Sequence, residues 1–132
     1  MTAAIYLART GKSKQEIKKY IEKEFKYNCS RSCDEIRLDY CFNSSCQGTC
    51  PQAITAFLEG NDFEDVIRNA VSLGGDSDTI TAIAGSIAEA FYGMPDYFKH
   101  KVIDFTDADM HDVMRRFEVV AVKRKFGVSF DI

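Results

Sequence analysis

The chain has 132 residues, which suits one domain, and its 45% hydrophobic and 28% charged residues exclude a disordered polymer. Its formal net charge of -3 gives no reason to expect nucleic-acid or anionic-membrane binding. No apolar stretch approaches the ~20 residues that cross a bilayer, and no basic leader precedes the first apolar run. We therefore expect a single domain over residues 1–132, in the cytoplasm, without nucleic-acid or membrane partners.

Apolar residues recur with a helical period nearly everywhere, which predicts an all-α fold, a helical bundle. The first apolar segment, residues 3–8, has no cap, so we expect it to be the surviving end of a longer helix. Ser13 and Glu16 form a capping box before a second helix. The apolar face of this second helix carries Ile17, Tyr20, Ile21 and Phe25. A short helix is expected over residues 33–42, around Ile36, Leu38, Tyr40 and Phe42.

The later helices are marked by their ends. Thr49 and Gln52 are spaced as a capping box with Pro51 in the first turn, and Gly60 is predicted to end that helix. Three more apolar stripes each predict a helix. The first of these helices ends at Gly74, the second ends at Gly93, and the third covers residues 110–120. The middle one is rich in small residues, which suits a central helix. Only residues 126–130 alternate like a strand, and a loose tail explains them equally well.

The cysteines are confined to one stretch of the chain. Their odd number, without a secretory leader, argues against a disulfide framework. They form no C-x2-C pair, and neither histidine lies nearby, whereas structural zinc sites usually use tighter pairs. We expect reduced, partly buried side chains with a structural role, and a zinc or redox site is the alternative. The five are Cys29, Cys33, Cys41, Cys46 and Cys50.

The most informative segment is Gly74-Gly75-Asp76-Ser77-Asp78-Thr79. The glycines allow a sharp turn, and an aspartate can cap the helix that follows. Capping explains Gly74 and Asp76 but leaves Asp78 and Thr79 to chance. Carboxylate and hydroxyl oxygens are the ligands that Mg2+ and Mn2+ prefer. The pattern therefore predicts Asp76, Asp78 and Thr79 as ligands of Mg2+ or Mn2+, and only half of a site, because three oxygens do not fill an octahedral shell of six.

Three segments together carry a resemblance: residues 8–14, residues 45–60 and residues 67–79. They resemble the ADP-ribosylglycohydrolase family, of the dinitrogenase-reductase-activating type, and the match runs from about residue 3 to residue 95. The resemblance implies an all-α fold with a site for two Mg2+ or Mn2+ ions that serves hydrolysis of the glycosidic bond between ADP-ribose and its acceptor. It implies that Asp76, Asp78 and Thr79 are metal ligands from the later half of that site. Gly75 and Ser45 are further candidates for contact with an ADP-ribose-type ligand.

The chain also departs from the family. Family members are much longer, and a Thr-Asp-Asp cluster with an acidic residue near the scissile bond belongs to their earlier part. A later acidic group consists of Asp104, Asp107, Asp109 and Asp112. This group does not follow a glycine turn, and we expect it to cap and solvate the last helix. We therefore expect a C-terminal portion of the enzyme, active when an N-terminal chain or self-association completes it. The alternative is a non-catalytic relative that keeps the scaffold, and the sequence assigns no catalytic base.

Overall fold

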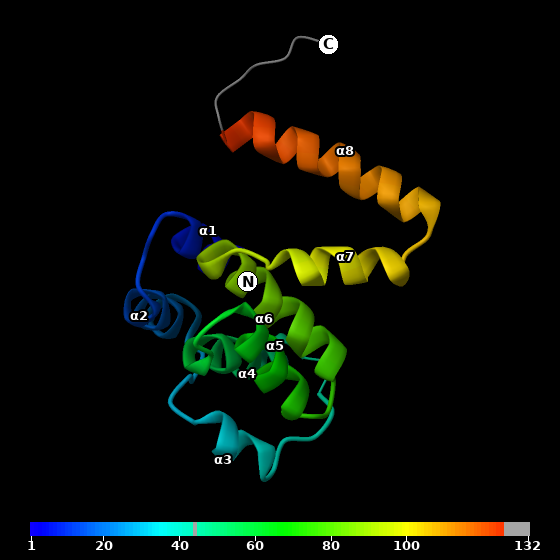
Figure 1. Ribbon diagram of the computed structural model, residues 1–132. Helices are drawn as coiled ribbons and strands as arrows, with labels where there is room; N and C mark the ends of the chain where they lie inside the picture. The colour runs from blue at the N-terminus through cyan, green and yellow to red at the C-terminus, as the bar shows by residue number, and fades with distance from the viewer. Residues whose placement is uncertain (44, 126–132) are drawn as a thin grey trace. The chain divides into compact units, whose positions relative to one another are not determined.

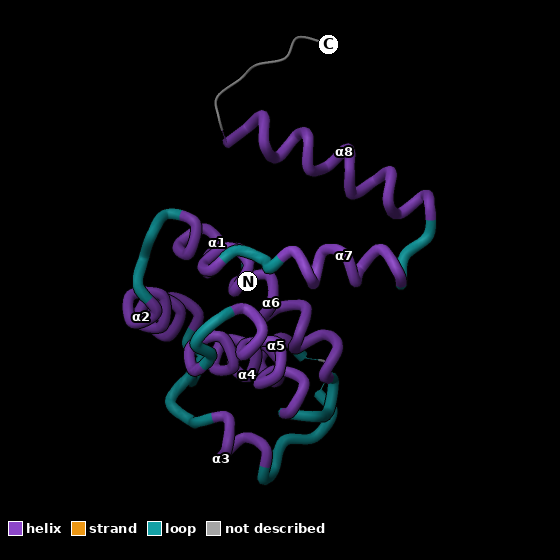
Figure 2. The backbone as a smooth tube through the Cα atoms, in the orientation of Figure 1, coloured by secondary structure: helices purple, strands orange, loops and turns teal. Residues whose placement is uncertain are grey.

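The computed structural model describes residues 1–43 and 45–125, with side chains to residue 120. Within these ranges the secondary structure is helical and no strand occurs, which confirms the all-α expectation (Figures 1 and 2). The alternating segment at residues 126–130 lies outside the described residues. No helix in the described part is long and apolar enough to cross a membrane. The helices fall into two compact units, Met1–Met94 and Pro95–Ile132, and the expected single domain stays a prediction.

The first unit contains α1 (Thr2–Arg9), α2 (Lys14–Phe25), α3 (Cys33–Arg37), α4 (Cys46–Glu59), α5 (Phe63–Ser72) and α6 (Ser77–Tyr92). Helix α6 packs against α1, α4 and α5, which confirms the central place expected from its small residues (Figure 1). A Cβ atom added to Gly85 would lie 2.9 Å from Ile67 Cδ1, so the glycine lets α5 approach α6 closely.

The core of this unit is built mainly from the predicted apolar faces, but Tyr20 and Phe25, expected on the apolar face of α2, are 42% and 47% exposed. Its largest fully buried side chains include Ile17 and Ile21 of α2, Phe57 of α4, and Ile80 and Ile87 of α6. Each such side chain stabilises the fold by about 1.5–3 kcal/mol relative to its exposed state. Because every one of them points to the shared core, the face of each helix that carries apolar residues fixes how that helix is rotated.

Helix starts follow local capping rules. Ser13 Oγ accepts from the Glu16 N–H, and the Glu16 carboxylate accepts from the Ser13 N–H at 2.9 Å, which confirms the predicted capping box. Ser32 and Glu35 form an equivalent box at α3, with a distance of 2.7 Å between the Ser32 nitrogen and Glu35 Oε2. This second box was not predicted from the sequence.

Two expected helix boundaries are wrong. Helix α4 begins one turn earlier than predicted, because Ser45 Oγ accepts from the Gly48 N–H at 3.0 Å and caps it. Thr49 therefore lies inside the helix and forms no capping box, and its hydroxyl donates to the Asn43 carbonyl at 2.8 Å. The helix expected within residues 33–42 ends at Arg37, after which the Leu38 side chain is 87% exposed.

The second unit contains α7 (Asp96–Asp104) and α8 (Ala108–Lys125). Helix α8 was predicted, whereas α7 was not, although Pro95 just before its first residue and Asp96 in its first turn are typical of a helix start. Asp107 Oδ1 accepts from the Met110 N–H at 2.8 Å, so one member of the later acidic group does cap the last helix. Asp112 pairs with Arg115 at 2.7 Å and Arg116 at 2.8 Å.

Candidate functional site

The site begins at the turn that joins α5 to α6. Gly74 and Gly75 both have left-handed backbone angles, with φ of 75° and 58°, which glycine adopts without steric cost. Asp76 follows at the N-cap position of α6, yet its side chain makes no capping hydrogen bond. The two glycines therefore form the turn that leads into α6. The half-buried Asp76 side chain is not used to cap the helix and can interact with other groups.

Asp78 and Thr79 lie in the same first turn and are exposed. The Thr79 N–H donates to Asp78 Oδ1 at 2.8 Å. This bond, and then the neighbouring Asp76 carboxyl, hold the pKa of Asp78 below its usual range, so that carboxyl is ionised at neutral pH. The structure thus places the three predicted metal ligands together on one turn, and their binding of a metal stays a prediction.

Tyr40 lies against this turn and was not singled out by sequence reasoning. A Cβ atom added to Gly75 would be 2.6 Å from Tyr40 Cε1 and 3.3 Å from the Cys41 carbonyl carbon. The segment before α4 therefore packs on the glycine turn. Nothing in the local pattern distinguishes Tyr40 from the aromatic residues around it, because the contact joins segments far apart in the sequence.

The two further ligand-contact candidates have different surroundings. Gly75 is part of the turn itself. Ser45 uses its hydroxyl to cap α4 and also donates to Asn43 Oδ1 at 2.7 Å. A role for either residue in ligand contact stays a prediction.

All five cysteines are free thiols; Cys29, Cys33 and Cys50 are buried, whereas Cys41 and Cys46 are exposed. Burial raises the pKa of Cys29 to about 11. Burial, and then the hydrogen bond and charge of Glu59, raise the pKa of Cys33 to about 12. Because the thiolate is the metal ligand and the nucleophile, these two buried thiols are poorly suited to either task at neutral pH.

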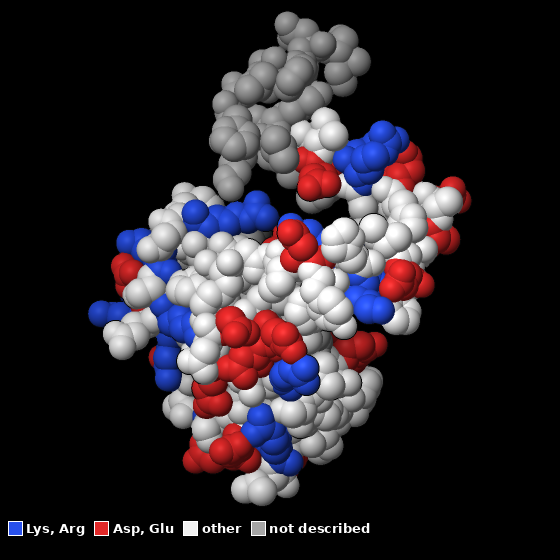
Figure 3. All heavy atoms as spheres, in the orientation of Figure 1, with Lys and Arg blue, Asp and Glu red and all other residues white. Residues whose placement is uncertain are grey.

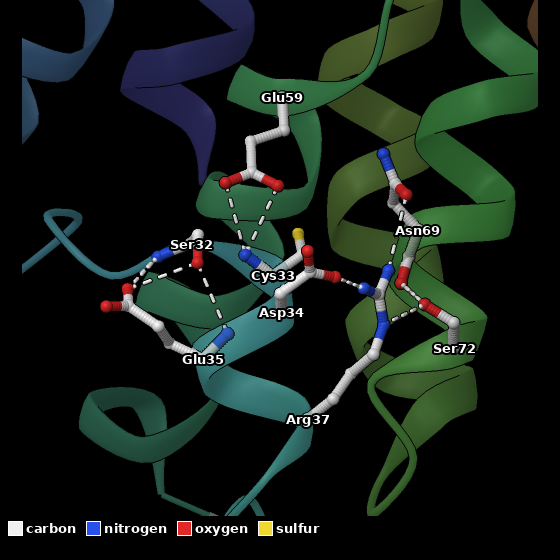
Figure 4. Close-up of polar contacts among 8 residues, drawn as sticks. All are labelled: Ser32, Cys33, Asp34, Glu35, Arg37, Glu59, Asn69 and Ser72. Carbon is white, nitrogen blue, oxygen red and sulfur yellow. Dashed lines mark hydrogen bonds and ion pairs between the residues drawn. The ribbon is translucent and has the colours of Figure 1, made fainter.

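A second polar cluster surrounds α3 (Figure 4). The Cys33 N–H donates to both carboxylate oxygens of Glu59, at 3.1 and 3.2 Å, which joins the start of α3 to the end of α4. Arg37 Nε donates to Ser72 Oγ at 2.9 Å, which joins α3 to α5. Within residues 1–43 and 45–120, no group of three or more His, Cys, Asp or Glu side chains is arranged to hold a metal ion.

A pocket of about 420 Å³ lies near this cluster, and none of the three predicted metal ligands lines it. Its walls come from α2, α3, α4 and the segment before α3: Lys18, Cys29, Ser30, Arg31, Ser32, Glu35, Thr55, Leu58 and Glu59. Both signs of charge line the pocket, and both signs are interspersed on the face of the protein drawn in Figure 3. The charged side chains of the lining are Lys18, Arg31, Glu35 and Glu59.

A match over most of the chain shows its family. The model of the ADP-ribosylglycohydrolase family matches residues 2–124. The chain belongs to the ADP-ribosylglycohydrolase family. This match confirms the resemblance at the level of the family, and the dinitrogenase-reductase-activating type stays a prediction.

Similar curated relatives share only part of their length with this member of the family. Human ADP-ribosylhydrolase ARH3 is 44% identical over 55 residues, which are 42% of this chain and 14% of the relative. The mouse ADP-ribosylhydrolase ARH3 is 35% identical over 74 residues, which are 54% of this chain and 19% of the relative. The matched stretch thus spans less than a fifth of each relative. No solved structure matches the chain.

Proposed function

We propose that this chain provides half of the divalent-metal site of an ADP-ribosylglycohydrolase, which hydrolyses the glycosidic bond between ADP-ribose and an acceptor. One observation carries the proposal. Asp76 occupies the N-cap position of α6 without capping the helix, and Asp78 and Thr79 follow in the same exposed turn. A residue chosen for helix stability alone would be expected to bond to the free N–H groups of that turn.

The donor set fits Mg2+ or Mn2+. Two carboxylates and one hydroxyl are hard oxygen donors, and the Asp78 carboxyl has a lowered pKa and is in the ionised form that binds a cation. Asp76, Asp78 and Thr79 would hold the ion or ions, and a metal bound there would orient the ribose and a water molecule and stabilise developing charge. The rigid helix start would fix the direction of these donors.

The proposed site needs further ligands, because three donors leave about half of an octahedral shell open. We propose that these come from a separate polypeptide or from a second copy of this chain. The human and mouse relatives named ADP-ribosylhydrolase, which are much longer than the matched stretch, support the hydrolase assignment and leave room for ligands from elsewhere. The cytoplasmic location expected from the sequence stays a prediction.

The experiment that tests this proposal is a titration of Mn2+ and Mg2+ into the purified chain, followed by calorimetry and, for Mn2+, by electron paramagnetic resonance. We expect weak binding that tightens when ADP-ribose is present and that is lost in Asp78→Asn. The matched control is Asp104→Asn, which removes an exposed carboxylate at the end of α7 and should leave binding unchanged.

Absence of binding in every combination, at concentrations where ADP-ribose would saturate a completed enzyme, would favour a non-catalytic relative that keeps the scaffold. Equal loss of binding in Asp78→Asn and Asp104→Asn would show that the ions are held by general surface charge. Either result would remove the support for a half-site at α6.

A further inference from the structure

Tyr40 shapes the turn that carries the candidate ligands. Its Cε1 and Cδ1 atoms lie 2.6 and 3.1 Å from the place where a Cβ of residue 75 would stand. The aromatic ring therefore occupies the space that any side chain at position 75 would need. Since Gly75 has a left-handed φ of 58° and leads directly into Asp76, the ring limits the path that the chain can take into α6.

The hydroxyl of Tyr40 is unusual. Its oxygen is buried, and it makes no hydrogen bond to any residue within the described ranges 1–43 and 45–120. A buried hydroxyl without a partner destabilises a fold, so its presence requires an explanation.

Two polar groups lie near this hydroxyl. The contact of the Tyr40 ring with Gly75 places the phenol beside the turn that carries Asp76. Burial raises the pKa of Tyr40, the Thr49 side chain lowers it, and the charge of Asp76 raises it. Thr49 gives its own hydrogen to the Asn43 carbonyl at 2.8 Å. The Asp76 side chain does not cap α6, and its carboxylate oxygens can accept a hydrogen bond. The Thr49 oxygen can still accept as well, so two acceptors are open to the Tyr40 hydroxyl, of which Asp76 alone is a candidate metal ligand.

We propose that Tyr40 is a positioning residue for Asp76: its ring fixes the Gly75 turn, and its hydroxyl donates to the Asp76 carboxylate when that carboxylate holds a cation. The second part rests on the proposed function, whereas the first does not. Carboxylates that bind metal ions are usually hydrogen-bonded in turn, and loss of such a partner typically costs about 10- to 100-fold in metal affinity. A donor kept beside Asp76 for this bond accounts for the otherwise unpaired hydroxyl.

Three variants separate the ring from the hydroxyl. Tyr40→Phe removes the hydroxyl alone, Tyr40→Ala also removes the ring, and Tyr6→Phe is the matched control on α1, where the tyrosine is 67% exposed. Each is examined by thermal melting, by Mn2+ binding, and by hydrogen exchange at the amides of Thr79 and Ile80. These amides donate to Asp78 Oδ1 and to the Asp76 carbonyl.

We expect Tyr40→Phe to melt at or above the wild-type temperature, because the hydroxyl makes no bond that holds the fold, and to bind Mn2+ about 10- to 100-fold more weakly. We expect Tyr40→Ala to exchange the Thr79 and Ile80 amides at least about tenfold faster, because the turn loses its support. Tyr6→Phe should match the wild type in all three measurements.

Unchanged exchange in Tyr40→Ala would overturn the role of the ring. A lower melting temperature for Tyr40→Phe, with no change in Mn2+ affinity, would show that the hydroxyl serves the fold alone and would overturn its role toward Asp76. If the wild-type chain binds no Mn2+, the proposed function fails for the isolated chain. The exchange and melting results then still decide whether Tyr40 supports the turn and whether its hydroxyl serves the fold.

Discussion

At the scale of single residues, the decisive positions are those where the backbone or a side chain lacks its usual partner. Gly74 and Gly75 share a left-handed conformation but differ in surroundings: nothing lies within 4 Å of a Cβ added to Gly74, whereas Tyr40 blocks one added to Gly75. The same glycine pair thus serves two purposes. Gly74 allows the left-handed backbone conformation, and Gly75 allows it and also leaves space for the Tyr40 ring.

This difference predicts unequal effects of alanine at the two glycines. Gly74→Ala should lower the free energy of unfolding by about 1–2 kcal/mol, because only the left-handed backbone is penalised. Gly75→Ala should lower it by about 2–4 kcal/mol, because the methyl group also collides with the Tyr40 ring. Urea unfolding measures both free energies. Equal losses in the two variants would mean that the Tyr40 ring moves aside for the methyl group without destabilising the fold.

At the scale of elements, α2 is tied to the end of α4 by one lysine. Lys14 Nζ donates to the carbonyls of Leu58 and Gly60, the former at 3.0 Å, and lies 5.4 Å from the ring centres of Phe57 and Tyr92. Tyr92 Oη donates to the same Gly60 carbonyl at 2.8 Å. A cation at a helix C-terminus satisfies carbonyls that have no partner within the helix.

Replacing this lysine should therefore destabilise the first unit. Lys14→Met keeps most of the aliphatic stem but removes the donor to the Leu58 carbonyl, while the Gly60 carbonyl keeps its bond from Tyr92, and we expect a loss of about 1–3 kcal/mol in the free energy of unfolding. The control is Lys19→Met on the exposed side of the same helix, where the change should stay within about 0.5 kcal/mol. Comparable losses in both variants in urea would argue against a specific tie between α2 and α4.

The capping boxes make stability depend on pH. The Ser13 N–H, followed by Lys12 and the Ser13 hydroxyl, lowers the pKa of Glu16 from its ordinary 4.5 to about 2. Because the folded value lies below the unfolded one, this contribution is fully present above about pH 4.5 and is lost as the pH falls toward about 2. The hydrogen bond from the Ser32 N–H likewise lowers the pKa of Glu35, the capping glutamate of α3.

Glu16→Gln should flatten this dependence, since glutamine can still accept a hydrogen bond but does not titrate. Between pH 5 and pH 2.5, urea unfolding should show a larger loss of stability in the wild type than in the variant. This pH window follows from the lowering of the Glu16 pKa from 4.5 to about 2. Parallel curves for the two proteins would mean that the capping box does not hold the Glu16 carboxylate in solution.

At the scale of the whole molecule, the buried hydrophobic core of the described residues lies in the first unit. The buried apolar side chains of the described residues run from Ala4 to Ala88, and α7 contains none. The second unit instead exposes several large apolar side chains, among them Phe105 at 85% and Phe117 at 72%. A helical pair in which none of the described side chains, up to residue 120, is buried is not expected to be stable by itself.

A fragment of residues 1–94 should therefore fold alone. We expect cooperative urea unfolding and a helical circular-dichroism spectrum for this fragment, and a largely unfolded spectrum for residues 95–132. If the fragment of residues 1–94 unfolds without cooperativity, the first unit depends on the second, and the chain is better described as the predicted single domain.

Local sequence patterns were enough to predict the helical class and most helix boundaries, because capping, apolar periodicity and glycine turns act over a few neighbouring residues. The same patterns select Asp76, Asp78 and Thr79 as candidate ligands, which stays a prediction. Prediction from the sequence missed α7, whose start is marked only by Pro95 and Asp96, and placed the start of α4 a turn late, because Thr49 and Ser45 are both capable caps. Only the tertiary structure decided that Tyr40 packs on Gly75 and that Lys14 reaches the end of α4. Those contacts join residues more than 30 positions apart, and the packing of helices around the core, which no local pattern encodes, brings them together.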